Sequence, residues 1–136
     1  MAPNLVPELN VGNFKRSLWF YCDLIGFQIL YDRPEHKFAM LDLNGARLMI
    51  EEVERPYTTT FATGNEPPEY ARIMNLEIQI PDIYAVYDRV LAAGLPLLVD
   101  MKERSFRVGA GSVKVKQFAV ADPDGFVIRP QCEIVD

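Results

Sequence analysis

Two runs of alternating apolar and polar residues flank a turn sequence near the C-terminus, and together they predict a β-hairpin. The runs cover residues 115–120 and 126–129, and alternation with a period of two puts every second side chain on one face of a strand. Between them, residues 122–125 read Asp-Pro-Asp-Gly. In this turn the proline fixes one φ angle and the glycine tolerates a positive one. One face of the hairpin can therefore be buried while the other stays accessible.

The N-terminal half predicts a strand, a helix and three further strands. Alternation over residues 5–11 predicts an edge strand, because it contains Pro7, which cannot donate a ladder hydrogen bond. Asn13 can cap a helix of about three turns, in which apolar residues recur at spacings of three and four until Gly26 stops it. The predicted strands that follow cover residues 27–31, 38–43 and 46–52.

A long connection follows and then the same order of elements begins again. Residues 54–71 have no sustained period and are rich in Pro, Thr and Gly, which fits either a plain linker or a flap over a site. After it, the pattern predicts a strand over residues 73–80 and a helix that Asp82 caps and Gly94 stops. Further strands are expected at residues 95–99 and, beyond an irregular stretch, at 106–108, before the C-terminal hairpin.

The two halves align as an internal repeat, which is the strongest sequence argument for the fold. The matched positions are Val11 with Ile80, Gly26 with Gly94, and Gly45 with Gly125. We therefore predict one α+β domain over residues 1–136, built of two βαβββ modules. The first module covers residues 3–53, the linker or flap 54–71, and the second module 72–134, with an enlargement between Met101 and Ser112.

Composition narrows the classes of partner. A net charge of −5 and a pI of about 4.9 disfavour nucleic acid and anionic membranes, since phosphate contacts need clustered Lys and Arg. The acidity fits a cationic ligand, although it also serves solubility. No apolar run approaches the length of a membrane span, and no secretory leader is evident. The two cysteines, Cys22 and Cys132, are too few for a disulfide framework, so we expect a cytoplasmic protein.

Two stretches of the chain resemble the vicinal-oxygen-chelate superfamily, which contains glyoxalases, extradiol dioxygenases, fosfomycin-resistance enzymes and bleomycin-resistance proteins. Residues 118–129, with their Asp-Pro-Asp-Gly-Phe-Val-Ile-Arg ending, resemble its C-terminal hairpin, and residues 9–27 resemble its opening strand and helix. The resemblance implies a curled mixed sheet around a cleft, in a homodimer. It says little about function, because this fold hosts unrelated chemistries.

The resemblance also implies four positions at which metalloenzymes of the superfamily carry metal ligands. In this chain they fall on Val6, Met49, Asn75 and Arg129. An alkyl group, a thioether, an amide and a guanidinium are poor ligands for a divalent metal. The only histidine, His36, lies in a separate turn. We therefore predict no metal, no cofactor and no catalytic residue.

A shift of two residues in this alignment would change the outcome. It would bring Glu8, Glu51 and Glu77 onto the inner faces, and an all-carboxylate site could hold Mg²⁺ or Mn²⁺. The alternative function is therefore a glyoxalase-like, metal-dependent lyase or isomerase that uses these carboxylates. A sensor or structural module with a filled cleft is a further alternative.

The pattern without metal ligands is closest to bleomycin-resistance proteins, which resemble this chain in the proline of the first strand. Pro7 would let the N-terminal arm cross to the partner subunit of a homodimer. Those proteins line their cleft with tryptophans, whereas the only tryptophan here, Trp19, is expected in the core or an interface. Arg129 in a cleft would suit an anionic ligand group or a neighbouring carboxylate.

We therefore predict metal-independent binding and sequestration of a small organic molecule, such as a bleomycin-type antibiotic, with no role for nucleic acid or membrane. Aromatic side chains can replace the missing tryptophans, and charged ones can fix the orientation of the ligand. The candidate ligand-binding residues are Tyr31, Phe38, Met49, Tyr57, Phe61, Asn75, Glu77, Lys114 and Arg129.

Overall fold

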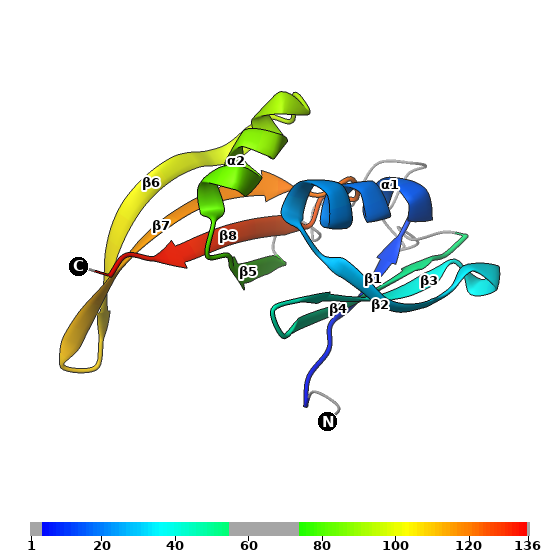
Figure 1. Cartoon of the computed structure of the whole chain (residues 1–136), viewed down its shortest axis with the longest axis horizontal. Coiled ribbons are helices and arrows are strands. Elements are labelled where there is room, and N and C mark those ends of the chain that lie inside the picture. The colour runs from blue at the N-terminus through cyan, green and yellow to red at the C-terminus, as the bar shows by residue number, and fades with distance from the viewer. Residues whose placement is uncertain (1–3, 55–73, 136) are drawn as a thin grey trace, which may run out of the picture. The chain divides into compact units, whose positions relative to one another are not determined.

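The chain folds as two four-stranded mixed sheets, each with its own helix. The computed structural model describes residues 4–54 and 74–135. Within these ranges the chain divides into two compact units, whose elements are labelled in Figure 1. Each unit has the order strand, helix, three strands, so the predicted α+β class and the two βαβββ modules are confirmed. No helix in the described ranges is long and apolar enough to cross a membrane.

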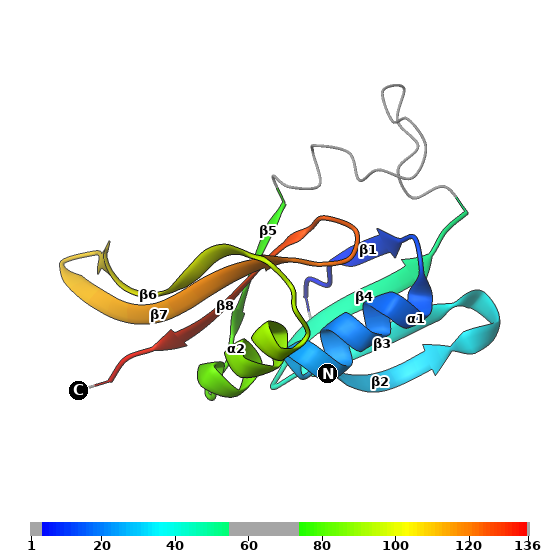
Figure 2. The ribbon, with the colours of Figure 1, turned by 90° about the horizontal axis from the view of Figure 1, so that it is seen from above.

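The first sheet has the strand order β1-β4-β3-β2, in which β1 and β4 run parallel and the other neighbours run antiparallel. Figure 2 shows α1 and the following helix, η1, lying along one face of this sheet. The elements of the unit are β1 (Glu8–Val11), α1 (Phe14–Leu18), η1 (Trp19–Ile25), β2 (Gln28–Arg33), η2 (Pro34–His36), β3 (Phe38–Leu43) and β4 (Ala46–Glu52).

Alternation in the strands directs one set of side chains toward the helix. Leu9 and Val11 of β1 are buried, while Glu8 and Asn10 between them are exposed. This is the period of two that separates the faces of a strand. The helical contribution to the core comes mainly from Phe20, Tyr21, Leu24 and Ile25, all buried.

The predicted single α-helix over residues 14–25 is only partly correct. It is α-helical for five residues and then π-helical over Trp19–Ile25. The amide of Gly26 donates to the Tyr21 carbonyl at 3.0 Å, a bond that spans five residues and so has π-helical spacing. Gly26 has a φ of 110°, which confirms it as the residue that ends the helix.

The second sheet repeats this arrangement with the order β5-β8-β7-β6, in which β5 and β8 are parallel. Its elements are β5 (Asn75–Gln79), α2 (Ile83–Ala92), β6 (Leu97–Val108), β7 (Gly111–Ala121) and β8 (Val127–Glu133). Asp82 caps α2, because its Oδ1 accepts from the Ala85 amide at 3.2 Å. The apolar side of α2 is buried, as the sequence predicts, through Ile83, Val86 and Val90.

Several strand boundaries differ from the sequence predictions, most of all in β6, β1 and β2. The irregular stretch expected after residue 99 is part of one long strand, β6, which absorbs two register shifts between Leu97 and Lys102. Such shifts interrupt the side-chain alternation without ending the strand. In the first unit, β1 begins at Glu8 rather than at residue 5, and β2 extends to Arg33.

Both predicted hairpin turns are confirmed. Asn44 and Gly45 have φ values of 51° and 96°, the pair of positive angles that a tight β3–β4 turn requires. In the C-terminal turn, Asp122 Oδ1 accepts from the amides of Asp124 and Phe126 at 2.9 and 2.8 Å. Gly125, with a φ of 93°, donates back to the Asp122 carbonyl at 3.0 Å.

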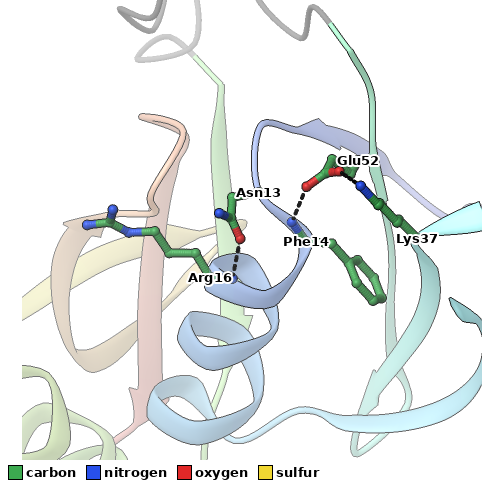
Figure 3. A network of polar contacts seen from close by, with 5 residues as sticks. All are labelled: Asn13, Phe14, Arg16, Lys37 and Glu52. Atoms are coloured by element: carbon green, nitrogen blue, oxygen red, sulfur yellow. Dashed lines mark hydrogen bonds and ion pairs between the residues drawn. The ribbon is translucent and has the colours of Figure 1, made fainter.

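The start of α1 is tied to the end of β4 by a single carboxylate (Figure 3). Glu52 Oε1 accepts from the Phe14 amide at 3.0 Å, and Glu52 Oε2 pairs with Lys37 Nζ at 2.6 Å. Asn13 Oδ1 accepts from the Arg16 amide at 3.0 Å, which confirms the predicted cap. The ammonium group and the helix amide favour the charged carboxylate and lower the pKa of Glu52.

We expect Glu52→Gln to lower the free energy of unfolding by roughly 0.5 kcal/mol near neutral pH, because the pair is partly solvated and screened. A lowered pKa gives stability that is present above the ordinary value of 4.5 and is lost as the pH falls through the folded value. The difference between wild type and variant should therefore shrink in acid. Urea unfolding across the acid range measures it, with the exposed Glu54→Gln as control. A difference that stayed constant with pH would contradict this role.

Candidate functional site

The helix covers only one face of the first sheet, and the other face carries most of the candidate residues of this unit. We call this other side the helix-free face of the first sheet. Strand register places a common set of side chains there. Its members are Glu8, Asn10, Tyr31, Arg33, Phe38, Met40, Asp42, Arg47, Met49 and Glu51.

Two aromatic rings and a guanidinium form a compact group on this face, which we call the aromatic–arginine cluster. The Tyr31 and Phe38 ring centroids lie 6.2 Å apart with an interplanar angle of 34°. The Arg33 Cζ lies 4.0 Å from the Phe38 centroid and 5.9 Å from that of Tyr31. Phe38 is 5% exposed, whereas Tyr31 is 46% exposed. The cluster therefore offers a flat organic ring the Tyr31 face and the outer side of a guanidinium plane.

A pair of carboxyl groups lies on the same face. Glu8 is directly opposite Met49, and Glu51, two residues further along β4, is opposite Asn10 on one side and Phe38 on the other. Desolvation raises the pKa of Glu8, and a hydrogen bond and charge repulsion from Glu51 raise it further. These two acidic groups therefore repel each other next to the aromatic–arginine cluster.

The placement of Val6 needs correction. Val6 precedes β1, and the Met49 amide donates to the carbonyl of Pro7 at 2.9 Å. Glu8 is thus the β1 residue opposite Met49. In the second unit, Glu77 lies opposite Arg129, and Asn75 lies opposite Val127.

The helix-free face of the second sheet carries an ion pair and three glutamines. Arg129 Nη2 donates to Glu77 Oε1 at 3.0 Å, so a neighbouring carboxylate is a partner of this arginine. Gln79 Nε2 donates to Glu77 Oε2 at 3.2 Å. Gln117 Nε2 donates to Gln131 Oε1 at 2.7 Å. The glutamines were missed because their spacing in sequence says nothing about which strands become neighbours.

Lys114 does not share this face. Lys114 is two residues before Lys116 in β7, so the two side chains point to the same side of the sheet. Lys116 Nζ donates to the hydroxyl of Tyr84 in α2 at 2.8 Å, which shows that this is the helix side. Lys114 is therefore on the side of the strand opposite that of Glu77 and Arg129. Two other candidates, Tyr57 and Phe61, lie outside the described residues. Trp19 is 36% exposed, so it is only partly within the core.

The donor chemistry of the described residues does not fit a divalent metal. No group of three or more His, Cys, Asp or Glu side chains comes together within residues 4–54 and 74–135. Met49 and Arg129 stand opposite the carboxylates Glu8 and Glu77. A thioether and a cation at these places cannot complete an oxygen or nitrogen donor set.

The fold agrees with comparisons to known proteins. A family model described as the Glyoxalase/Bleomycin resistance protein/Dioxygenase superfamily matches residues 5–129. The chain belongs to this superfamily. The expected resemblance is therefore confirmed over most of the sequence.

Relatives within the superfamily differ in function. A bleomycin resistance protein from Geobacillus stearothermophilus is 28% identical over 130 residues, covering 90% of this chain and 91% of the relative. A lactoylglutathione lyase from Haemophilus influenzae is 29% identical over 126 residues, covering 89% and 85%. The solved structure of TioX from Micromonospora has a TM-score of 0.67 at 20% identity, covering 98% of this chain and all of the other, and supports the fold.

We expect Glu8→Gln to raise the free energy of unfolding at neutral pH by roughly 0.5 kcal/mol or less, because it removes repulsion between two partly solvated carboxyls. Since the folded pKa of Glu8 is raised, the gain should appear as the pH rises through that pKa and vanish in acid. Glu51→Gln should give a similar gain, and the double variant little more than either single change. Denaturant unfolding of the three variants measures this. Fully additive gains would show that the two carboxyls do not interact.

Proposed function

We propose that the protein binds and sequesters a small organic molecule without a metal and without converting it. A bleomycin-type glycopeptide is the candidate ligand. The observation that carries this proposal is the aromatic–arginine cluster on the helix-free face of the first sheet, next to two carboxyl groups. Together they combine a stacking surface with negative charge.

The cluster suits a flat ring that is linked to a positive charge. Tyr31 is half exposed and tilted with respect to Phe38, so a heteroaromatic ring can lie on its outer face. Phe38 pairs with Glu51 across β3 and β4, which brings a carboxylate to the edge of the stacking surface. A cationic arm of the ligand can then reach Glu51 or Glu8 while the ring stays stacked.

The comparisons support the same ligand class. The bleomycin resistance relative covers nearly the whole chain, and the net charge of −5 favours a cationic ligand. Met49 and Arg129 favour binding over metal-assisted chemistry, because they stand where donor atoms would be needed.

We further propose that it acts as a cytoplasmic homodimer with an N-terminal arm that crosses to its partner. Pro7 has no amide hydrogen and lies at the start of an edge strand, which suits a chain that leaves its own sheet. Leu5 lies in this arm and is 83% exposed, so packing of the arm against the partner subunit would bury its apolar side chain. The free thiols Cys22 and Cys132 suit a reducing compartment.

Calorimetric titration of the full chain with metal-free bleomycin should show saturable binding with about one drug per chain and micromolar affinity. Tyr31→Ala should weaken binding about tenfold, the equivalent of one aromatic stack. The matched control is Tyr84→Ala, which removes a similarly exposed tyrosine from α2. The copper complex of bleomycin should bind as well, because the proposed cluster holds the flat rings of the drug and not its metal-chelating groups. An absence of heat with both forms, or equal effects of the two substitutions, would overturn the proposal.

The second candidate function is a metal-dependent lyase or isomerase, favoured by the Glu8–Glu51 pair and the lactoylglutathione lyase relative. We expect protein incubated with Mn²⁺, Ni²⁺ or Zn²⁺ and then desalted to retain no stoichiometric metal by elemental analysis. It should also fail to convert the hemithioacetal of methylglyoxal and glutathione. Retained metal, together with turnover that Glu8→Gln abolishes, would favour the enzyme instead. Glu35→Gln, in an exposed turn, is the control.

A further inference from the structure

The outer half of the β6–β7 hairpin concentrates positive charge in an acidic protein. Residues 102–116, which we call the basic arm, contain five of the 14 Lys and Arg residues of the chain but one of its 19 Asp and Glu residues. The arm therefore carries a charge of +4, and since the whole chain carries −5, the remaining residues carry −9. Figure 1 shows the hairpin continuing past α2 to its own turn. Its charge is thus presented away from the helix.

The cations that β6 contributes to the basic arm have no carboxylate partners. Lys102, Arg104 and Arg107 are all exposed. None of them forms an ion pair with a residue that the structure describes. Arg104 Cζ lies 5.0 Å from the ring centroid of Phe106, which is itself 38% exposed. These three groups can therefore pair with negative charges from outside the chain.

The backbone of the same stretch is open on one side. β6 is an edge strand, because β7 pairs with one side of it and no strand within residues 4–54 and 74–135 pairs with the other. From Lys102 to Val108 its register with β7 is continuous, so the segment is regularly extended. Such an edge directs the N–H and C=O groups of every second residue outward, where an extended polypeptide can bind them.

The alternation of β6 determines where an added strand needs its acidic residues. Lys102 and Arg104 are two residues apart and share one face of the strand. Arg107 is three residues beyond Arg104 and lies on the other face. Opposite charges placed directly across two antiparallel strands stabilise the pairing. Carboxylates opposite these three cations follow the order acid-x-x-acid-x-acid along an antiparallel strand.

We propose that the outer edge of β6 is a docking site for an acidic segment of another protein, which adds to the second sheet as an antiparallel strand. Its carboxylates pair with Lys102, Arg104 and Arg107, and its backbone pairs with the open edge. A nucleic acid fits less well, because it cannot extend the backbone ladder and the other residues of the chain, at −9, repel phosphates. A second copy of this chain fits less well, because each basic arm carries +4.

The test uses the capped peptide acetyl-Val-Glu-Val-Thr-Glu-Lys-Glu-amide, whose acidic residues have this order, and the isotope-labelled full chain. NMR titration at low salt should shift the backbone amide signals of residues 102–108 saturably, with a dissociation constant on the order of 100 μM. A peptide with Gln in place of each Glu should bind at least tenfold more weakly. So should the rearranged peptide acetyl-Glu-Glu-Glu-Val-Lys-Thr-Val-amide, which has the same composition but places its charges out of register.

Arg104→Gln and Arg107→Gln should each weaken binding of the acidic peptide about fivefold, because each removes one cross-strand charge pair. The matched control is Arg16→Gln, which removes an exposed arginine from α1 and should leave the affinity unchanged. The backbone spectrum checks that all three variants fold.

Four outcomes would overturn the docking site. They are the absence of shifts in residues 102–108, equal binding of the rearranged peptide, equal effects of the three substitutions, and tighter binding of a seven-residue oligothymidylate than of the acidic peptide. Sedimentation of the variants covers the remaining occupant, since a change in oligomeric state with Arg107→Gln would assign the edge to a second copy instead. Bleomycin is absent from these experiments, so their outcome is independent of the titration with the drug.

Discussion

The parallel pairing of the first and last strands in each unit is the constraint on which the structure depends. With this pairing, the strands that the helix joins, β1 to β2 and β5 to β6, lie at opposite edges of their sheet and run in the same direction, so the chain has to cross the sheet between them. The helix covers one face of the sheet as it crosses, and its apolar side supplies the core. The other face is left to the side chains of β1 and β4, or of β5 and β8. The pairing therefore determines which residues can act together, Glu8 with Met49 and Glu77 with Arg129.

The two units use the same backbone plan for different chemistry. Glu8 and Glu77 occupy equivalent places, but the residue opposite each is a thioether in one unit and a guanidinium in the other. Glu77 is thereby neutralised by Arg129, whereas Glu8 has another carboxyl, Glu51, as its polar neighbour. The first face is consequently aromatic and acidic, and the second is neutral and rich in hydrogen bonds. A thioether opposite Glu8 and a guanidinium opposite Glu77 are poor partners for a divalent metal in either donor set.

The sequence predicted the elements well because their signals are local. Helix caps at Asn13 and Asp82, the stop at Gly26 and the two glycine turns depend on residues within a few positions of one another. The repeat then identified the fold without any knowledge of contacts. Strand limits were less accurate where register shifts break the alternation, as in β6.

Site residues were predicted less well, because a site depends on register between distant strands. The sequence could not show that Glu8 stands opposite Met49 and Glu77 opposite Arg129. The sequence named Lys114 as a ligand candidate without its face, and the strand alternation places it on the side of Lys116. Arg33 was missed because the predicted strand ended at residue 31, whereas β2 extends to Arg33. Tyr31 and Phe38, in contrast, are brought together on one face as a ligand site would require.

Adjacent residues of β4 place carboxylates with opposite electrostatic surroundings on the two faces of one sheet. Glu52 points toward the helix, where the Phe14 amide and Lys37 favour its charge and lower its pKa. Glu51, on the opposite face, interacts with the Glu8 carboxyl through a hydrogen bond and like charge, and raises the pKa of Glu8. The favourable carboxylate thus anchors the fold, and the unfavourable pair lies beside the stacking surface. Under the proposed function, a cationic ligand group placed there would relieve the repulsion, and the strain of the free carboxyl pair would then add to the affinity for a positive charge.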